Sequence, residues 1–240
     1  RLTVNPEDDV IAIRERIGVA TDMELRSKSD AQVAEAVIRK AIEEVRGETI
    51  YKQQVPAGTT YRYTPPSFIK FNSPVLREKL AEICDAPFIV KVDGKITEPA
   101  TLKNAAAVVT INGRGYKMGI GGLHSTEKSA SHWADDETLL RDVDVVSFYP
   151  ELIRKCGLAP KNMGPAFTRV YGGFIDRRIA AKKAGHATTA QTLKIFLNGA
   201  FGKLGSPYSV LYAPDLLIQV TLTGQLMLLM MIERMEAAGI

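Results

Sequence analysis

Hydrophobic positions follow a helical period in several parts of the chain. In residues 29–46 the apolar side chains recur at helical spacing behind a Ser-x-x-Gln capping box, and Gly47 ends the pattern. Because only Gly185, His186 and Ala187 separate two of the further helices, we expect those two to form an antiparallel hairpin. The further helices are predicted at residues 7–17, 73–84, 149–156, 165–184, 188–203 and 215–238.

Strand-like runs and turn dipeptides fill the middle of the chain. Two β-hairpins are predicted: 88–92 with 95–97 around Asp93-Gly94, and 108–111 with 116–118 around Asn112-Gly113. Residues 51–66 are predicted to be extended or loop, and residues 119–125 a glycine-rich loop. We also expect a short buried strand over Val143–Phe148. Hairpins followed by helices indicate an α+β fold.

The composition is ordinary for a folded protein. The chain has 240 residues, of which 45% are hydrophobic and 24% charged, enough for one large domain or two smaller ones. The two cysteines, Cys84 and Cys156, lie far apart among apolar residues. A disulfide framework or a metal-binding cysteine pair is therefore not expected, and a reducing compartment is. The first residues have no signal-peptide pattern, and we interpret the chain as a segment of a longer polypeptide.

An apolar run at Leu216–Ile232 raises the question of a membrane span. A spanning helix needs about 20 mostly apolar residues. This run carries Gln219, Thr221, Thr223 and Gln225. We therefore predict a buried core helix and no membrane partner.

Basic residues are concentrated in the predicted helical hairpin. The net charge of the chain is only +4, which by itself decides nothing about a polyanionic partner. On the first helix Arg178 and Lys182 are four residues apart, and on the second Lys194, Asn198 and Phe201 share one face. Such a row can be a solvated basic surface. Its continuation into an amide and an aromatic side chain favours a site that binds a triphosphate.

Asp144 is the central candidate for chemistry. It lies in an apolar run that ends in a Ser-Phe-Tyr-Pro turn at 147–150. Its carboxylate could be satisfied by backbone N–H groups at a strand end, or it could bind Mg²⁺, which prefers carboxylate and phosphate oxygens. Asp142 could assist or be a solvated strand end. Phe148 and Tyr149 could be core aromatics, or could lie under a nucleotide whose phosphates accept hydrogen bonds from the helix start.

These two segments resemble motifs of a known family. Asp144–Pro150, with the pattern Asp-x-x-Ser-Phe-Tyr-Pro, resembles motif A of family B DNA polymerases, bacteriophage type. Lys194–Gly202, with the pattern Lys-x3-Asn-Gly-x-Phe-Gly, resembles their motif B. Gly199 and Phe201 stand where the family usually has serine and tyrosine. The loss of the tyrosine hydroxyl affects any water-mediated check of the base pair, whereas the packing role of an aromatic ring remains.

The resemblance implies a polymerase palm, an antiparallel sheet with packed helices, into which a helical-hairpin fingers subdomain is inserted. It is good over about Gly119–Ile240 and loose before that. The implied divisions are an N-terminal helical and hairpin region at 1–118, palm with motif A at 119–163, fingers with motif B at 164–205 and a palm helix at 206–240.

The resemblance also implies roles for individual residues. Asp144, as the catalytic carboxylate, and the carbonyl of Val145 would hold two Mg²⁺ ions, with the second site completed by residues outside this chain. Gly121, Gly122, Phe201 and Gly202 would contact DNA. The ring of Tyr149 would exclude a 2′-hydroxyl from the sugar site. The residues that would bind the incoming dNTP are Ser147, Phe148, Tyr149, Arg178, Lys182, Lys194 and Asn198.

The implied reaction is two-metal nucleotidyl transfer, in which a primer 3′-hydroxyl attacks the α-phosphate of a dNTP and pyrophosphate leaves. A further carboxylate is expected from an Asp-Thr-Asp hairpin, motif C, beyond Ile240, so we expect the segment alone to be inactive. The implied partners are primer–template DNA, dNTP and replication accessory proteins, in the cytoplasm of a host cell. Two alternatives stay open: a non-catalytic nucleic-acid-binding module that uses the basic hairpin, and an RNA polymerase or primase.

Overall fold

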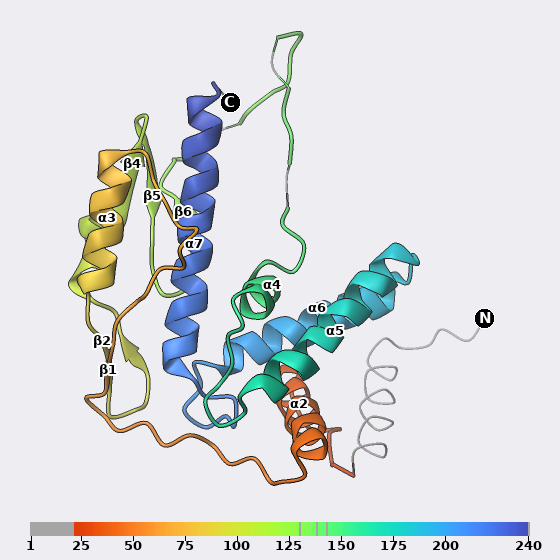
Figure 1. Ribbon diagram of the computed structural model, residues 1–240. Helices are drawn as coiled ribbons and strands as arrows, with labels where there is room; N and C mark the ends of the chain where they lie inside the picture. Colours follow the sequence, from red (N-terminus) through yellow and green to blue (C-terminus); the bar gives the residue numbers. More distant parts are fainter. Residues whose placement is uncertain (1–21, 130, 138, 143, 240) are drawn as a thin grey trace. The chain divides into compact units, whose positions relative to one another are not determined.

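The computed structural model describes residues 22–129, 131–137, 139–142 and 144–239, and it divides into two compact units (Figure 1). Unit 1 takes the described part of Arg1–Gln54 together with Ile153–Ala213. Unit 2 takes Val55–Leu152 together with the described part of Pro214–Ile240. The fold is α+β, as predicted. The helix predicted over 7–17 lies outside the described residues, and the finer palm and fingers divisions stay a prediction.

Unit 1 is built on three helices that pack against one another. They are α2 (Asp30–Arg46), α5 (Pro165–Lys183) and α6 (Ala187–Lys203). The predicted capping box begins α2, because the Ser29 hydroxyl accepts from the Gln32 N–H while the Gln32 side chain accepts from the Ser29 N–H. Gly47 ends the helix in the left-handed conformation at φ 69°. Local sequence signals therefore determine both ends of α2.

The predicted hairpin of α5 and α6 is confirmed, and the two helices lie side by side in Figure 1. The buried Tyr171 hydroxyl donates to the Leu197 carbonyl at 3.0 Å. The rings of Phe174 and Phe196 meet at a centroid distance of 4.5 Å. These contacts join the inner faces of α5 and α6.

Unit 2 combines two three-stranded antiparallel sheets with helices. The first sheet has the order β1 (Thr60–Tyr61), β2 (Phe88–Val90), β3 (Ile96–Thr97), and the second β4 (Val108–Ile111), β5 (Arg114–Lys117), β6 (His124–Ser125). Its helical segments are α3 (Pro74–Asp85), the 3₁₀ turns η1 (Ala100–Leu102) and η2 (Asn104–Ala107), α7 (Pro214–Ala237) and the start of α4 (Phe148–Lys155).

Both predicted β-hairpins are confirmed. β4 and β5 pair directly across Asn112 and Gly113, whose φ values of 45° and 80° suit a tight turn between twisted strands. The glycine loop predicted over 119–125 is shorter than expected, because His124 and Ser125 pair with β5 as strand β6. That pairing depends on a neighbouring strand, and the loop's own composition does not reveal it.

The buried strand predicted over Val143–Phe148 is wrong for its described residues. Asp144 and Val145 have no regular structure, a turn follows, and Phe148 already begins α4. Val145 and Val146 are 44% and 41% exposed. A strand needs a hydrogen-bonded neighbour, and the six described strands pair among themselves without one beside this segment. Val143 lies outside the described residues.

Helix α7 is the core helix of unit 2, as predicted. Ile218, Leu222, Leu226 and Leu229 are buried in the same cluster as side chains of α3 and both sheets. The described part of the chain contains one helix that is long and apolar enough to cross a bilayer, judged by length and composition only, and this helix is α7. Its burial accounts for that apolar character without a membrane.

Several polar side chains on α7 form hydrogen bonds with other parts of unit 2. Gln219 donates to the Thr64 carbonyl at 2.7 Å, and the Thr223 and Tyr63 hydroxyls lie 3.0 Å apart. Each of these side chains thus joins α7 to the segment at 63–64, near the start of unit 2. The Thr223–Tyr63 pair is buried, and a polar group in a core is tolerated when it finds a partner of this kind, whereas the Gln219 hydrogen bond is exposed.

Gln225 makes the most buried of these polar connections, with 0% of its surface exposed. Its Oε1 accepts from the Gly119 N–H at 3.0 Å, and its Nε2 donates to the Gly119 carbonyl at 2.7 Å and to the Thr221 carbonyl at 3.1 Å. Both backbone groups of one loop residue are therefore held by one side-chain amide. This arrangement attaches the loop at 119–122 to the middle of α7.

We predict that Gln225→Met lowers the free energy of unfolding by about 2–3 kcal/mol, because buried amide partners lose their hydrogen bonds while the side-chain volume is kept. Chemical denaturation measures the effect. The matched control is Gln219→Met on the same helix, whose hydrogen bond is solvent-exposed and should cost less than about 1 kcal/mol. Equal losses in the two variants would contradict a special role for Gln225.

Candidate functional site

The segment that resembles motif A lies in unit 2 and begins exposed. Asp142, Asp144 and Val145 are all exposed. The described residues of the predicted buried strand do not form one, and the Asp144 carboxylate is accordingly exposed. An exposed carboxylate pays no desolvation cost and is open to a cation or to solvent.

Ser147 changes the direction of the chain between Asp144 and α4. It is buried and has a φ of 54°, in the left-handed region that serine seldom adopts. Its carbonyl accepts from the Glu151 N–H at 2.8 Å, the bond that begins the helix. Strained backbone of this kind is concentrated at functional sites. The turn at Ser147 directs Phe148 and Tyr149 toward α7, whereas Val145 and Val146 before it stay exposed.

Phe148 and Tyr149 stack on each other and pack against α7. Their ring centroids are 5.6 Å apart, with the planes inclined by 24°. A Cβ atom added to Gly224 would lie 2.8 Å from Tyr149 Cε1 and 3.3 Å from Phe148 Cε1, so the rings rest directly on the helix backbone. Partial burial of Tyr149 raises the pKa of its hydroxyl. That group is therefore protonated, and able to donate a hydrogen bond, throughout the neutral range.

The glycine loop lies beside Tyr149. A Cβ atom added to Gly122 would be 3.8 Å from the Tyr149 hydroxyl and 4.0 Å from His124 Nε2, whereas one added to Gly121 would meet nothing within 4 Å. Neither glycine has a positive φ, so the space around the loop is their distinctive property. The structure thus brings together two segments that the sequence predicted separately for nucleotide and for DNA.

A surface pocket of about 560 Å³ adjoins the same loop. The residues that line it include 119–122 of the loop together with Lys103, Lys117, His124 and Glu98. Both lysines and the histidine are exposed. The pocket therefore combines a glycine-rich loop with two exposed lysines and one carboxylate, and the lysines could attract a phosphate group.

The cofactor that the resemblance implies is Mg²⁺, which would need several oxygen donors around Asp144. The described residues contain no group of three or more His, Cys, Asp or Glu side chains arranged to hold a metal ion. Asp144 and the Val145 carbonyl alone do not make up a two-metal site, which needs several oxygen ligands. The described residues therefore do not form a complete metal site by themselves.

The segment that resembles motif B lies on α6 in unit 1. Lys194, Asn198 and Gly202 are exposed and Phe201 is half-buried, whereas Leu197 and Ala200 point into the unit. The lysine and the amide, four residues apart, therefore stand together on the open side of α6. Among the described residues, no ion pair is found for Lys194 or for Lys182.

Gly199 has a structural reason for departing from the family's serine. A Cβ atom added there would lie 2.9 Å from Ala31 Cα and 3.3 Å from Ala31 Cβ, because α2 crosses α6 at this point. Lys203, one turn further along, pairs with Glu35 of α2 at 3.3 Å. Helix α2 thus covers the side of α6 opposite to Lys194 and Asn198. Sequence analysis did not predict this packing.

Basic charge dominates the α5–α6 hairpin. Residues 165–203 contain seven lysines and arginines and one acidic residue, Asp176, which pairs with Arg154 at 2.6 Å. The guanidinium of Arg177 lies 5.6 Å from the ring centroid of Phe174. Arg178 is half-buried on the row that continues Tyr171 and Ile175, so it is less open to a ligand than the exposed Lys182.

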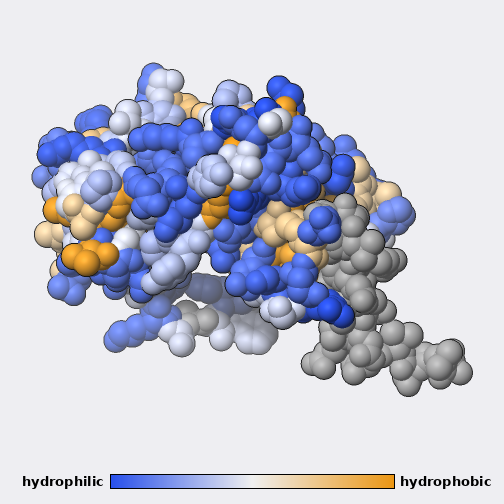
Figure 2. Space-filling model, turned by 90° about the horizontal axis from the view of Figure 1, so that it is seen from below, coloured by the Kyte–Doolittle hydropathy of each residue, from blue (hydrophilic) through white to orange (hydrophobic). Residues whose placement is uncertain are grey.

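The face of the molecule seen in Figure 2 is largely hydrophilic, with small separate hydrophobic patches.

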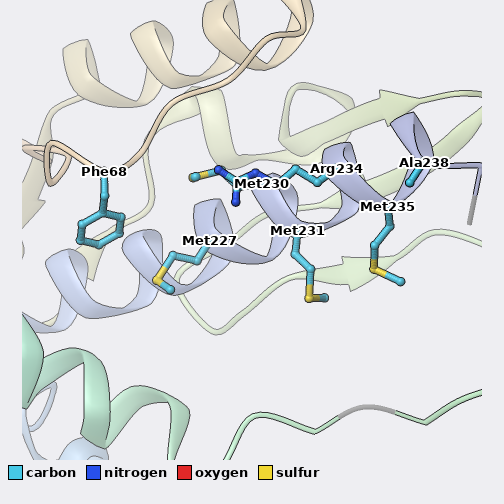
Figure 3. A pocket seen from close by; sticks show the side chains of 7 residues that line it. All are labelled: Phe68, Met227, Met230, Met231, Arg234, Met235 and Ala238. Carbon is cyan, nitrogen blue, oxygen red and sulfur yellow. The ribbon is translucent and has the colours of Figure 1, made fainter.

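A methionine groove of about 340 Å³ lies along the C-terminal half of α7 (Figure 3). Met227, Met231 and Met235 follow one another along the helix, and Phe68 stands at one end. Arg234 is the charged member of the lining. The groove offers no groups for nucleotide chemistry, and we assign it no role in the site.

Comparisons with known proteins return no match: no protein-family model, no curated protein and no solved structure matches this chain.

Two functional candidates in unit 2 were missed by sequence reasoning, namely Gly224 and Gln225 on α7. The available signal was a glycine and an amide side chain inside an otherwise apolar helix. Sequence analysis used the amide only to argue against a membrane span. Apart from the Thr221 carbonyl, their partners lie about 72 to 106 residues away in the chain, so that no local pattern identifies them.

We predict opposite signs for two glycine substitutions on α6. Gly199→Ala should lower the free energy of unfolding by about 1–3 kcal/mol, because the new methyl group meets the backbone of α2. The methyl group added by Gly202→Ala would meet no other atom within 4 Å. This change should therefore raise the free energy of unfolding by about 0.5–1 kcal/mol through the higher helix propensity of alanine. Thermal and urea unfolding measure both. Two stabilising changes would contradict the close approach of α2 and α6.

Proposed function

We propose that this chain is the palm-and-fingers part of a template-directed DNA polymerase of the family B type, which transfers a nucleotide from dNTP to a primer 3′-hydroxyl. The observation that carries the proposal is that Tyr149, which packs on Gly224 of α7, lies beside Gly122 of the glycine loop. The resemblance predicts sugar binding for the tyrosine and template contact for the glycines. Their proximity within unit 2 supports one site that serves both.

In unit 2 the stacked rings of Phe148 and Tyr149 would form a firm platform for the sugar of the incoming nucleotide. A ring resting on helix backbone cannot retreat, so it would clash with a 2′-hydroxyl. The loop at 121–122 leaves open space above its backbone, which a DNA strand could approach closely. Ser147 would keep this turn directed toward the nucleotide.

In unit 1 the open side of α6 would hold the triphosphate. Lys194 supplies a positive charge and Asn198 an amide donor on the same face. Lys182 would add charge from α5, and the half-buried Arg178 would do so to a smaller extent. Lysine side chains exposed on the surface of the hairpin suit a ligand with several negative charges.

The cytoplasm of a host cell is the compartment we propose. Cys84 and Cys156 are free thiols, and burial raises the pKa of both, which makes them poorly reactive. Free thiols of this kind suit a reducing compartment. Replication accessory proteins are further proposed partners.

A second candidate function is a non-catalytic nucleic-acid-binding module. The basic hairpin favours it, because seven basic residues and one acidic residue make a surface suited to phosphates. Such a module would bind DNA with a steep dependence on salt and no dependence on Mg²⁺ or Asp144. The requirement for Asp144 therefore separates the two functions.

In the protein expressed from its complete reading frame, we predict that Asp144→Ala lowers dNTP incorporation by at least about a thousandfold. Removal of this carboxylate should leave primer–template binding measurable, since the basic surfaces remain. Primer extension and fluorescence anisotropy measure the two properties. The matched control, Asp142→Ala, removes a neighbouring exposed carboxylate and should retain incorporation. Full activity of Asp144→Ala would exclude the proposed catalytic role.

We predict that Lys194→Ala raises the apparent KM for dNTP roughly tenfold, because a charge-assisted contact to phosphate is lost. Steady-state primer extension measures it. Lys183→Ala, which removes the same charge from an exposed position on α5, should leave KM within about twofold. An equal rise in both variants would indicate a general charge effect and would remove Lys194 from the triphosphate site.

A further inference from the structure

Two consecutive residues in the middle of α7 hold the two parts of the candidate site. Gly224 carries the rings of Phe148 and Tyr149, and Gln225 carries the glycine loop through Gly119. Both residues are buried. The site thus rests on one turn of a helix whose neighbouring residues are packed in the core.

Neighbouring side chains leave no room for a side chain at Gly224. A glycine inside a helix costs about 1 kcal/mol relative to alanine, and Gly224 has no left-handed backbone that would require it. An added Cβ would lie 2.8 Å from Tyr149 Cε1, 3.3 Å from Phe148 Cε1 and 3.3 Å from Leu152 Cδ1. Three side chains of one helical turn of α4 therefore meet at this point. A methyl group here would push the Tyr149 ring away from α7.

Gln225 fixes the other part of the site by hydrogen bonding. Its amide satisfies the N–H and the carbonyl of Gly119 at 3.0 and 2.7 Å. Further along the same loop, Gly122 lies beside the Tyr149 hydroxyl, so that a Cβ atom added to this glycine would be 3.8 Å from it. The ring and the loop are consequently held at one separation by adjacent residues of the same helix.

We infer that Gly224 and Gln225 are positioning residues that set sugar selectivity and template contact. Gly224 acts through Tyr149, whose ring it holds where a ribose 2′-hydroxyl would fall. Gln225 acts through its hydrogen bonds to Gly119, which hold the loop that the proposed function assigns to template contact. This inference rests on the proposed function, since it assigns the part of that site which discriminates dNTP from rNTP.

The first test measures kcat/KM for dNTP and for rNTP in the protein expressed from its complete reading frame. Gly224→Ala should lower the dNTP preference about tenfold, as a small displacement of a discriminating group does. Tyr149→Ala should lower it at least as much. The double variant should match Tyr149→Ala alone, because Gly224 has no ring left to position. Gly173→Ala on α5, where nothing lies within 4 Å, is the matched control and should leave the preference unchanged.

The second test uses Gln225→Met, which adds no atoms to the crowded point at Gly224. It should raise the Kd for primer–template about tenfold while leaving the KM for dNTP within about twofold. This arm also decides the inference if Gly224→Ala does not fold, which circular dichroism would reveal. A folded Gln225→Met variant with an unchanged Kd would then overturn it.

An unchanged dNTP preference in folded Gly224→Ala, or independent additive losses in the double variant, would likewise overturn the positioning role. These results would leave the proposed function intact, because the wild-type protein would still incorporate dNTP. Failure of the proposed function has a different signature, since the wild-type protein itself would then extend no primer.

Discussion

The hydrogen bonds between the buried Gln225 amide and the backbone of Gly119 are the constraint on which unit 2 depends. They join a half-buried surface loop to the centre of its longest helix, where the Gln225 amide without these bonds would be a buried unsatisfied group. The adjacent Gly224 then brings the start of α4 onto the same helix turn. Directional bonds and close packing at neighbouring positions thereby build a site from three distant parts of the chain.

Unit 1 uses a comparable constraint at Gly199. The backbone of α2 approaches α6 so closely there that a side chain is excluded, and the Glu35–Lys203 pair continues the contact one turn further on. This packing leaves the opposite side of α6 open, with Lys194 and Asn198 on it. Gly199 departs from the serine that motif B usually has at this position. The close packing of α2 gives this departure a physical cause that is separate from any contact with a nucleotide.

The sequence predicted the features that depend on local chemistry. The capping box at Ser29 and the turn dipeptides at 93–94 and 112–113 determine their elements over a few residues, and the structure confirms them. Strand β6 and the contacts of Gly224 and Gln225 depend on partners far away in the chain. The strand expected at Asp144 failed for the same reason, because alternation of side chains cannot supply a neighbouring strand.

Nucleotidyl transfer is the central claim, and templated extension of a primer by one nucleotide tests it most directly. The protein expressed from its complete reading frame would be mixed with a labelled primer–template, Mg²⁺ and one dNTP at a time. The account predicts a product one nucleotide longer with the complementary dNTP alone, and none after chelation of Mg²⁺. DNA binding of equal strength with and without Mg²⁺, accompanied by no extension with any dNTP, would contradict it.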